Sequence, residues 1–274
     1  MTRPTGPFAR ALPLGLIAAA MVVVATTSCT EINSAAGHVA GLEFDTLPAP
    51  SVVAGDTLRD SLGRAAPLRA LAFGASGDLI TNTAIQYITL DTGITIGAGG
   101  FVTAQRRSGT VKILASAGSL QTQGRSLIIA RRPDSAIATG KLRDSLFYVT
   151  PDNATTNTAA ALTVKVATND TTGGIATTQG WLVSYQAFFR GNAIAPGDTS
   201  VVFLLGDGVQ RSGLDTTGSD GTASRRVRVR PIGITQAPND SVVVLATVRH
   251  LGAHIRGSPL RFVIFLRPKL GAAR

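Results

Sequence analysis

Beyond residue 30, the chain repeats short runs of β-branched and other apolar residues, separated by glycine, proline, asparagine, aspartate and serine. No window in the same stretch combines a helical apolar period with capping residues. Half-buried strands produce the first pattern, whereas amphipathic helices require the second. Glutamate, a good helix former, occurs only as Glu31 and Glu43. The sequence therefore predicts an all-β protein.

The strongest strand predictions lie in the second half of the chain. Residues 162–166 alternate apolar with polar side chains, 241–245 is almost wholly apolar, and 260–267 ends before Pro268, which cannot donate to a ladder. Short strands at such spacing are typical of β-sandwiches. The predicted strands are 50–54, 57–61, 67–73, 83–90, 101–105, 110–116, 126–132, 142–149, 161–168, 181–189, 200–205, 223–230, 241–249 and 260–267.

A stretch of small, turn-prone residues divides these strands into two groups. The phrase GDTLRDSL, starting at Gly55, recurs loosely as GKLRDSL, starting at Gly140, which indicates that equivalent strands open both groups. Each group is long enough to enclose one hydrophobic core. We predict two tandem β-sandwich domains, at 43–132 and 141–268, joined by a linker at 133–140 and followed by a tail at 269–274.

Three phrases carry a family resemblance. Residues 100–104, followed by 109–115, resemble the closing hairpin of group 2 bacterial Ig-like domains. Residues 215–223 resemble the turn before a strand in group 1 bacterial Ig-like domains of the invasin and intimin type, with 181–185 as the central strand. The resemblance covers most of 43–268 and implies Ig-like sandwiches. It implies no particular ligand, because Ig-like folds host many unrelated functions.

Aromatic residues are distributed unevenly between the two predicted domains. In the first, Tyr87 takes the place of the tryptophan often found on the central strand of Ig-like domains. The second is expected to be the more robust, because buried aromatic side chains contribute heavily to a core. We expect its core to contain Trp181, Phe188, Phe189, Phe203, Phe262 and Phe265.

The first 28 residues have the layout of a secretory signal. Arg3 and Arg10 give a basic start, and an uncharged apolar run covers 11–25. About fifteen apolar residues are fewer than the roughly 20 that a membrane-spanning helix needs. No later stretch is a candidate span. We predict that 1–28 is a signal peptide.

The only cysteine of the chain, Cys29, follows the small residue Ser28 directly after this segment. The arrangement resembles the lipobox of bacterial lipoproteins, although Thr26 replaces the usual leucine; the alternative is an ordinary signal with an unmodified thiol nearby. The resemblance implies lipid on Cys29, a lipidated tether at 29–42, and a membrane-anchored, exported protein of the bacterial cell envelope. Thr30, rather than aspartate, favours the outer membrane.

Arginines cluster on one predicted strand, 223–230. Arg226, Arg228 and Arg230 alternate with valines, which places the three arginines on the face opposite the core. Such a face is a candidate polyanion-binding site. A solvated face that resists aggregation is the alternative. The formal net charge of the chain, +10, fits both interpretations.

The residue types needed for catalysis or metal binding form no recognised motif. His250 and His254 have an i, i+4 spacing, but the zincin glutamate is missing and Gly252 opposes a helix. A single cysteine excludes an internal disulfide framework. Aspartates near turns are candidates for Ca²⁺, which takes oxygen ligands, or are solvated turn residues. These aspartates are Asp198, Asp207, Asp215 and Asp220.

The sequence as a whole predicts a non-catalytic envelope lipoprotein that acts as a spacer, a scaffold or an adhesin-like module. The alternative is a binding module for an acidic envelope polymer or glycan, which would use Arg226, Arg228 and Arg230. The expected partners are the membrane, through the lipid, and an acidic polysaccharide or another envelope protein. Nucleic acid is not expected for an exported chain. We predict no catalytic residue, no metal site and no cofactor.

Overall fold

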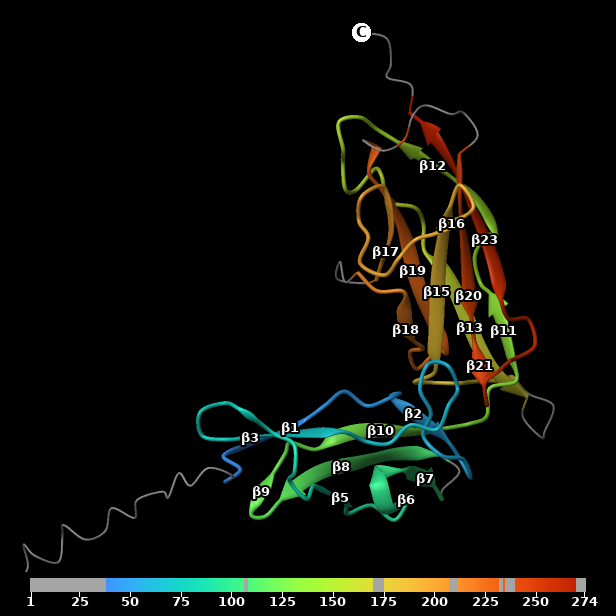
Figure 1. The fold of residues 1–274 in the computed structure, drawn as a ribbon. Coiled ribbons are helices and arrows are strands. Elements are labelled where there is room, and N and C mark those ends of the chain that lie inside the picture. The colour runs from blue at the N-terminus through green and yellow to red at the C-terminus, as the bar shows by residue number, and fades with distance from the viewer. Residues whose placement is uncertain are drawn as a thin grey trace, which may run out of the picture. The chain divides into compact units, whose positions relative to one another are not determined.

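The computed structural model describes a β-protein (Figure 1). Val39–Arg274 forms one compact unit. Regular structure in the described residues is β-strand apart from one short 3-10 turn, η1 at Ala98–Gly100, so the predicted all-β fold is confirmed. None of the described helical structure is long and apolar enough to cross a membrane. The described residues are 38–105, 108–169, 175–206, 211–231, 234 and 240–269, so the predicted signal at 1–28, Cys29 and most of the tether lie outside them.

The strands fall into two groups in chain order. The first group consists of β1 (Gly41–Phe44), β2 (Ser51–Val53), β3 (Ala70–Phe73), β4 (Leu79–Ile80), β5 (Gln86–Thr89), β6 (Ile94–Ile96), β7 (Val102–Ala104), β8 (Gly109–Ala117), β9 (Leu120–Gln121) and β10 (Arg125–Ala130). The second consists of β11 (Ser135–Ala138), β12 (Arg143–Tyr148), β13 (Leu162–Asn169), β14 (Ile175–Thr177), β15 (Leu182–Phe189), β16 (Asn192–Ala193), β17 (Val202–Leu205), β18 (Leu214–Thr216), β19 (Thr222–Val229), β20 (Ser241–Thr247), β21 (Arg249–His250), β22 (Ala253–His254) and β23 (Leu260–Pro268).

The first sandwich, β1 to β10, is built from two sheets and a hairpin. One sheet has the order β2-β10-β8-β5 with β9 on β8, the other has the order β1-β3-β4, and β6 pairs with β7. β2 runs parallel to β10, whereas the other strand pairs are antiparallel. One hydrophobic cluster joins these elements and includes Phe44, Val102, Ile113 and Leu127.

The second sandwich, β11 to β23, has longer strands. One sheet has the order β12-β23-β20-β15-β16 with β18 on β15, and the other has the order β11-β13-β19-β17 with β14 on β13. β12 runs parallel to β23. Alternate residues of these strands form a second, larger core cluster, which includes Val164, Val183, Val227, Val244 and Phe262. The two clusters give each group of strands its own hydrophobic interior.

Successive side chains of a strand point to opposite faces of the sheet, and this alternation decides which of them enter the second core. In β20, Val242, Val244 and Ala246 are fully buried, whereas the residues between them face the other side of the sheet and are half-exposed. The aromatic residues follow the same rule. Phe262 is fully buried in the core, but Phe188 and Phe265 have the opposite parity and lie on the outer face.

The expected aromatic core is therefore largely wrong. Only Phe262 of the six aromatic residues belongs to the buried cluster, with Trp181 and Phe189 packed against its margin. Phe203 is 7% exposed, yet it has the parity of the outer face and is covered there by arginines. Strand parity, rather than aromatic character, decides which of these side chains enter the core.

Several local predictions differ from the structure. The expected linker at 133–140 contains β11, which pairs with β13 and buries Ala136 in the core. The predicted strand at 57–61 is a turn with isolated bridges, so the two GDTLRDSL-like phrases are not structurally equivalent. β7 and β8, expected to form one hairpin, lie in different sheets because β5 and β10 already pair with β8 on its two sides. The domain boundaries themselves stay predictions.

Two turns precede strands of the sheets, and the second of them was predicted. The backbone N–H of Gly97 donates to the Phe101 carbonyl at 2.8 Å, which closes the turn between β6 and β7. Residues 218–221 form the turn before β19, with the Gly221 N–H donating to the Gly218 carbonyl at 3.0 Å. Gly221 has φ +75°, a conformation that glycine adopts without strain.

Candidate functional site

The predicted polyanion face lies on β19, where its three arginines have different environments. Arg226 is exposed, Arg230 is half-buried and Arg228 is 6% exposed. The Nη2 atom of Arg228 lies 2.8 Å from both carboxylate oxygens of Asp152. Its Nη1 donates to the carbonyls of Asn157 and Val229. The expectation of a solvated face is therefore wrong at Arg228, whose charge is used inside the molecule; polyanion binding stays a prediction.

Arg230 also has a partner within the sandwich. Its guanidinium carbon lies 5.4 Å from the centre of the Phe203 ring, and that of Arg211 lies 5.5 Å from the same ring. A cation over an aromatic face is attracted by the ring quadrupole. The two arginines thereby cover an aromatic side chain on the outer face of β17. Of the three predicted residues, Arg226 alone is fully open to solvent.

Arg225, which the sequence analysis did not single out, is buried on the core side of β19. It lies 2.9 Å from the carboxylate of Asp215 and donates to the carbonyls of Ser212 and Leu214. Its Nη1 would lie 3.0 Å from a Cβ at Gly206. The sequence did contain a signal for this residue, because strand parity groups Arg225 with the buried Val227 rather than with Arg226.

The described aspartates considered for Ca²⁺ have hydrogen-bond partners within the protein. Asp215 accepts the Ser224 N–H at 2.7 Å in addition to pairing with Arg225. Backbone N–H groups of Ser200 and Thr222 lower the pKa of Asp198 and of Asp220, respectively. Asp207 lies outside the described residues. Among the described residues, no three His, Cys, Asp or Glu side chains gather in a way that could hold a metal ion.

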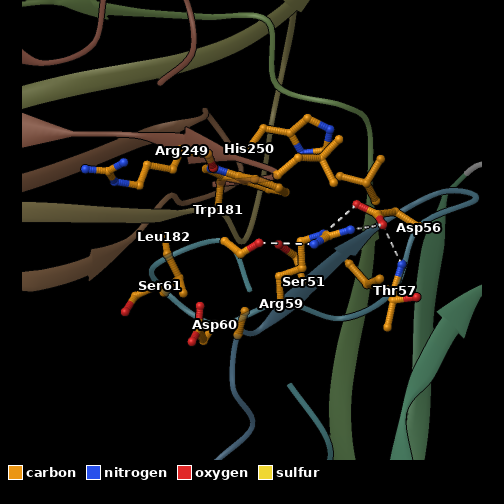
Figure 2. Close-up of a pocket in the computed structure, with 15 residues that line it drawn as sticks. Ser51, Asp56, Thr57, Arg59, Asp60, Ser61, Trp181, Leu182, Arg249 and His250 are labelled. Atoms are coloured by element: carbon orange, nitrogen blue, oxygen red, sulfur yellow. Dashed lines mark hydrogen bonds and ion pairs between the residues drawn. The ribbon is translucent and has the colours of Figure 1, made fainter. Parts of the chain in front are cut away.

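A pocket of about 30 Å³ lies between the 56–63 turn of the first sandwich and the β21–β22 hairpin of the second (Figure 2). The Ser51 hydroxyl donates to the Gly180 carbonyl at 2.6 Å and ties β2 to the turn before β15. The Trp181 indole Nε1 donates to the Arg249 carbonyl at 3.3 Å. We call this region, formed by Ser51, the 56–63 turn, 180–182 and 249–252, the joint.

The charged groups of the joint are paired with each other. Arg59 forms two hydrogen bonds with the Asp56 carboxylate, at 3.0 and 2.8 Å, and a third with the Gly63 carbonyl at 3.1 Å. Burial raises the pKa of Asp56, but hydrogen bonds from Arg59 and from the Thr57 N–H outweigh it and lower the pKa below its usual value. Asp56 is thus an ionised carboxylate whose partners come from its own turn.

His250, one of the two histidines considered in the sequence, faces this pocket. Its ring centre lies 5.9 Å from that of Trp181, and its buried Nδ1 has no hydrogen-bond partner among the described residues. Burial lowers the pKa of His250, and the charge of Arg132 lowers it further. His250 is therefore neutral at pH 7. His254 lies opposite Arg249 across the hairpin, so the two histidines do not converge on one site.

Backbone atoms approach closely in the joint because glycines leave room for them. A Cβ on Gly63, which has φ +80°, would lie 2.2 Å from the Gly252 nitrogen. A Cβ on Gly180 would lie 3.0 Å from Ser51 Cβ and from Ile128 Cδ1. A real Cβ would not fit at 2.2 Å without displacement of one backbone. The geometry is that of a packed connection rather than of an open reactive cleft.

Comparisons with known proteins give a distant likeness only. No family model matches the chain, and no curated protein is significantly similar to it. Domains 4 and 5 of the S-layer protein SbsC align at 12% identity and a TM-score of 0.29, covering 84% of this chain and 99% of that one. The Yersinia pseudotuberculosis adhesin InvE aligns at 11% and 0.29, covering 84% and 60%. The D00-D0 domain of intimin aligns at 10% and 0.23, covering 81% and 99%.

Proposed function

We propose that this chain is a non-catalytic module of the bacterial cell envelope, exported, held by lipid on Cys29, and acting as a spacer, a scaffold or an adhesin-like unit. The joint carries the proposal. Its pocket of about 30 Å³ is an order of magnitude smaller than the roughly 300–1,000 Å³ of typical small-molecule sites. Its polar groups bind one another: Asp56 with Arg59, Ser51 with Gly180, and Trp181 with Arg249. Of these bonds, the one from Ser51 to Gly180 joins the two sandwiches.

The interiors of both sandwiches fit a structural role. Each has its own apolar cluster, and the charged groups buried in the second, Arg225 and Arg228, have carboxylate partners in Asp215 and Asp152. Perturbed groups that converge on an open cleft would favour catalysis. Here the partly buried charges are paired within turns and strands, which favours a structural module.

The anchor is supported by the position of Cys29. The chain has no other thiol, and this one follows an apolar run and small residues. Lipid chains contribute about 0.8 kcal/mol per buried CH₂, so more than one chain gives stable attachment without a membrane-spanning helix. Acidic-polymer binding through β19 finds less support, because Arg228 is already paired with Asp152.

Cell fractionation with mass spectrometry tests the anchor. The wild-type chain should be found with membranes and should carry an acylated N-terminal Cys29. The Cys29→Ser variant should move to the soluble fraction or accumulate as an uncleaved precursor. A wild-type N-terminus that is unmodified, or that begins at another residue, would contradict the lipid anchor.

Thiol labelling on intact cells tests display at the surface. Leu90 is 89% exposed, so Leu90→Cys in the lipidated chain offers one accessible thiol to a membrane-impermeant maleimide. Val227→Cys is the matched control, since Val227 is fully buried and its thiol should react only after denaturation. Labelling of Leu90→Cys only after cell lysis would show that the module does not face the outside.

A further inference from the structure

The outer face of the sheet β12-β23-β20-β15 has an apolar centre. Phe188, Val243 and Val263 lie side by side across three strands, since Val243 is the register partner of both others. Leu245 lies two residues from Val243 along β20, and Phe265 two residues from Val263 along β23. These side chains have the parity opposite to the core. A solvent-facing sheet surface normally carries polar residues at such positions.

An open hollow of about 520 Å³ lies over part of this centre. Phe188, Val243 and Leu245 line it, together with Ser241 and Arg261. One carboxylate borders the hollow, that of Asp240, which lies 2.7 Å from Arg190. Unlike the pocket in the joint, this hollow is within the size range of ligand sites.

Three exposed arginines surround the apolar centre: Arg143, Arg261 and Arg267. Register places them on this same face, with Arg143 opposite Val263, Arg261 opposite Leu245 and Arg267 opposite Phe147. None of the three has an ion pair among the described residues. The face therefore presents positive charge that the described part of the chain does not balance.

The arrangement of the charges selects among possible occupants. Arg261 and Arg267 are six residues apart on β23, which corresponds to about 20 Å along a strand, and Arg143 lies on the neighbouring strand at a level between them. A row of cations over such a length matches a linear polyanion. A second copy of this face would bring arginines against arginines and be repelled.

We propose that this face binds a linear acidic polysaccharide. The arginines bind its acidic groups through paired N–H donors, and the apolar side chains between them pack against the C–H faces of the sugar rings. Phe147, which is 54% exposed beside Arg267, extends the apolar surface toward one end of the row. The inference names a ligand and a site beyond the proposed function, and it rests on neither Cys29 nor export.

Binding of defined polymers to the purified full-length chain tests the proposal. The probes are polygalacturonate, dextran sulfate, neutral dextran and poly-L-glutamate, and the test variant is Arg143→Gln with Arg261→Gln and Arg267→Gln. The control removes the same charge from exposed arginines of the first sandwich, through Arg64→Gln, Arg69→Gln and Arg125→Gln. We expect at least one acidic polysaccharide to bind, neutral dextran not to bind, and the test variant to lose about tenfold or more, as charge-assisted bonds are the strong ones.

A second variant, Phe147→Ser, keeps the charge and removes an exposed apolar side chain. It should weaken binding by about threefold, because packing against a ring face is weaker than an ion pair. Equal losses in the test and control variants would overturn the site, since they would show attraction by net charge alone. If poly-L-glutamate binds as tightly as the acidic polysaccharides, the assignment of a sugar ligand is wrong. If neither acidic polysaccharide binds, the whole proposal is wrong. Membrane fractionation of the wild type is unaffected by all of these outcomes.

Discussion

The two sandwiches use arginine differently. In the first, Arg59 is half-exposed and pairs with Asp56 of its own turn, and the core cluster is purely apolar. In the second, Arg225 and Arg228 are buried, and each extends to a carboxylate from another segment. Long arginine stems cover apolar surface while the guanidinium satisfies carbonyls at the ends of strands. Much of the positive charge on β19 is thus paired inside the protein. The number of arginines in the sequence therefore overstates the positive charge that is available to bind a ligand.

The largest expected effect separates the two cores. Phe262→Ala should destabilise the second sandwich by ~3–5 kcal/mol, because a fully buried aromatic ring leaves a cavity. Leu127→Ala is the counterpart in the first sandwich, also fully buried, and should cost ~2–5 kcal/mol there. Calorimetry should show each variant lowering one transition and leaving the other in place. A single transition that both variants shift equally would mean that the sandwiches unfold as one unit.

One added methyl group in the joint should lower the stability of the protein more than the same methyl group at an open turn. Gly63→Ala would place its Cβ 2.2 Å from the Gly252 nitrogen, so one backbone must move, whereas Gly77→Ala adds a methyl with nothing within 4 Å. Both glycines have positive φ, so both variants share a cost of about 1–2 kcal/mol, and only Gly63→Ala should add a further ~1–3 kcal/mol.

Limited trypsin digestion measures whether the joint has opened. Gly63→Ala should speed cleavage after Arg131, between β10 and β11, and Gly77→Ala should not. Identical digestion of the two variants would show that the Gly63–Gly252 approach does not hold the sandwiches together.

The smallest of the three expected effects concerns the ion pair between Asp152 and Arg228 in the second sandwich. Asp152→Asn should cost about 1–2 kcal/mol at pH 7, since Arg228 is buried but the carboxylate is partly exposed. Burial raises the pKa of Asp152, yet hydrogen bonds from Arg228 and Asn157 lower it on balance. A lowered folded-state pKa means that this contribution is complete above the usual value of 3.8 and is lost as pH falls through the lower folded value.

Denaturant titrations across acid pH provide the measurement. The difference between wild type and Asp152→Asn should shrink below about pH 4. Asp78→Asn, an exposed carboxylate of the first sandwich, serves as the control and should change stability by less than about 0.5 kcal/mol at every pH. A difference that stays constant down to pH 2 would show that Asp152 stabilises without its charge.

The sequence predicted those strands whose pattern reflects a single buried face. The predicted strands 161–168 and 260–267 match β13 and β23 to within one residue at each end, because each alternates across one core. Two-residue strands such as β4 and β16 were missed, since each is the short return strand of a hairpin with the strand just before it and is too brief to show an alternating pattern. β11 was taken for a linker because its small residues are also typical of turns.

The sites were harder to predict than the strands. The joint depends on Gly63 meeting Gly252, two glycines whose local patterns indicate turns and nothing of each other. The face with Arg143, Arg261 and Arg267 was missed as well. Arg261, Val263, Phe265 and Arg267 alternate within one strand, but the sequence analysis assigned Phe265 to the core, and the pairing with β12 that adds Arg143 requires the fold.

Parallel pairing gives both sandwiches a mechanical property. β2 is bonded in parallel to β10, and β12 to β23, so an early and the final strand of each sandwich lie side by side. Tension applied to the two chain ends pulls such neighbours in opposite directions along their length, and the hydrogen bonds between them are loaded together rather than broken singly. The six-residue ladder of β12 with β23, against three residues for β2 with β10, makes the second sandwich the one that yields last.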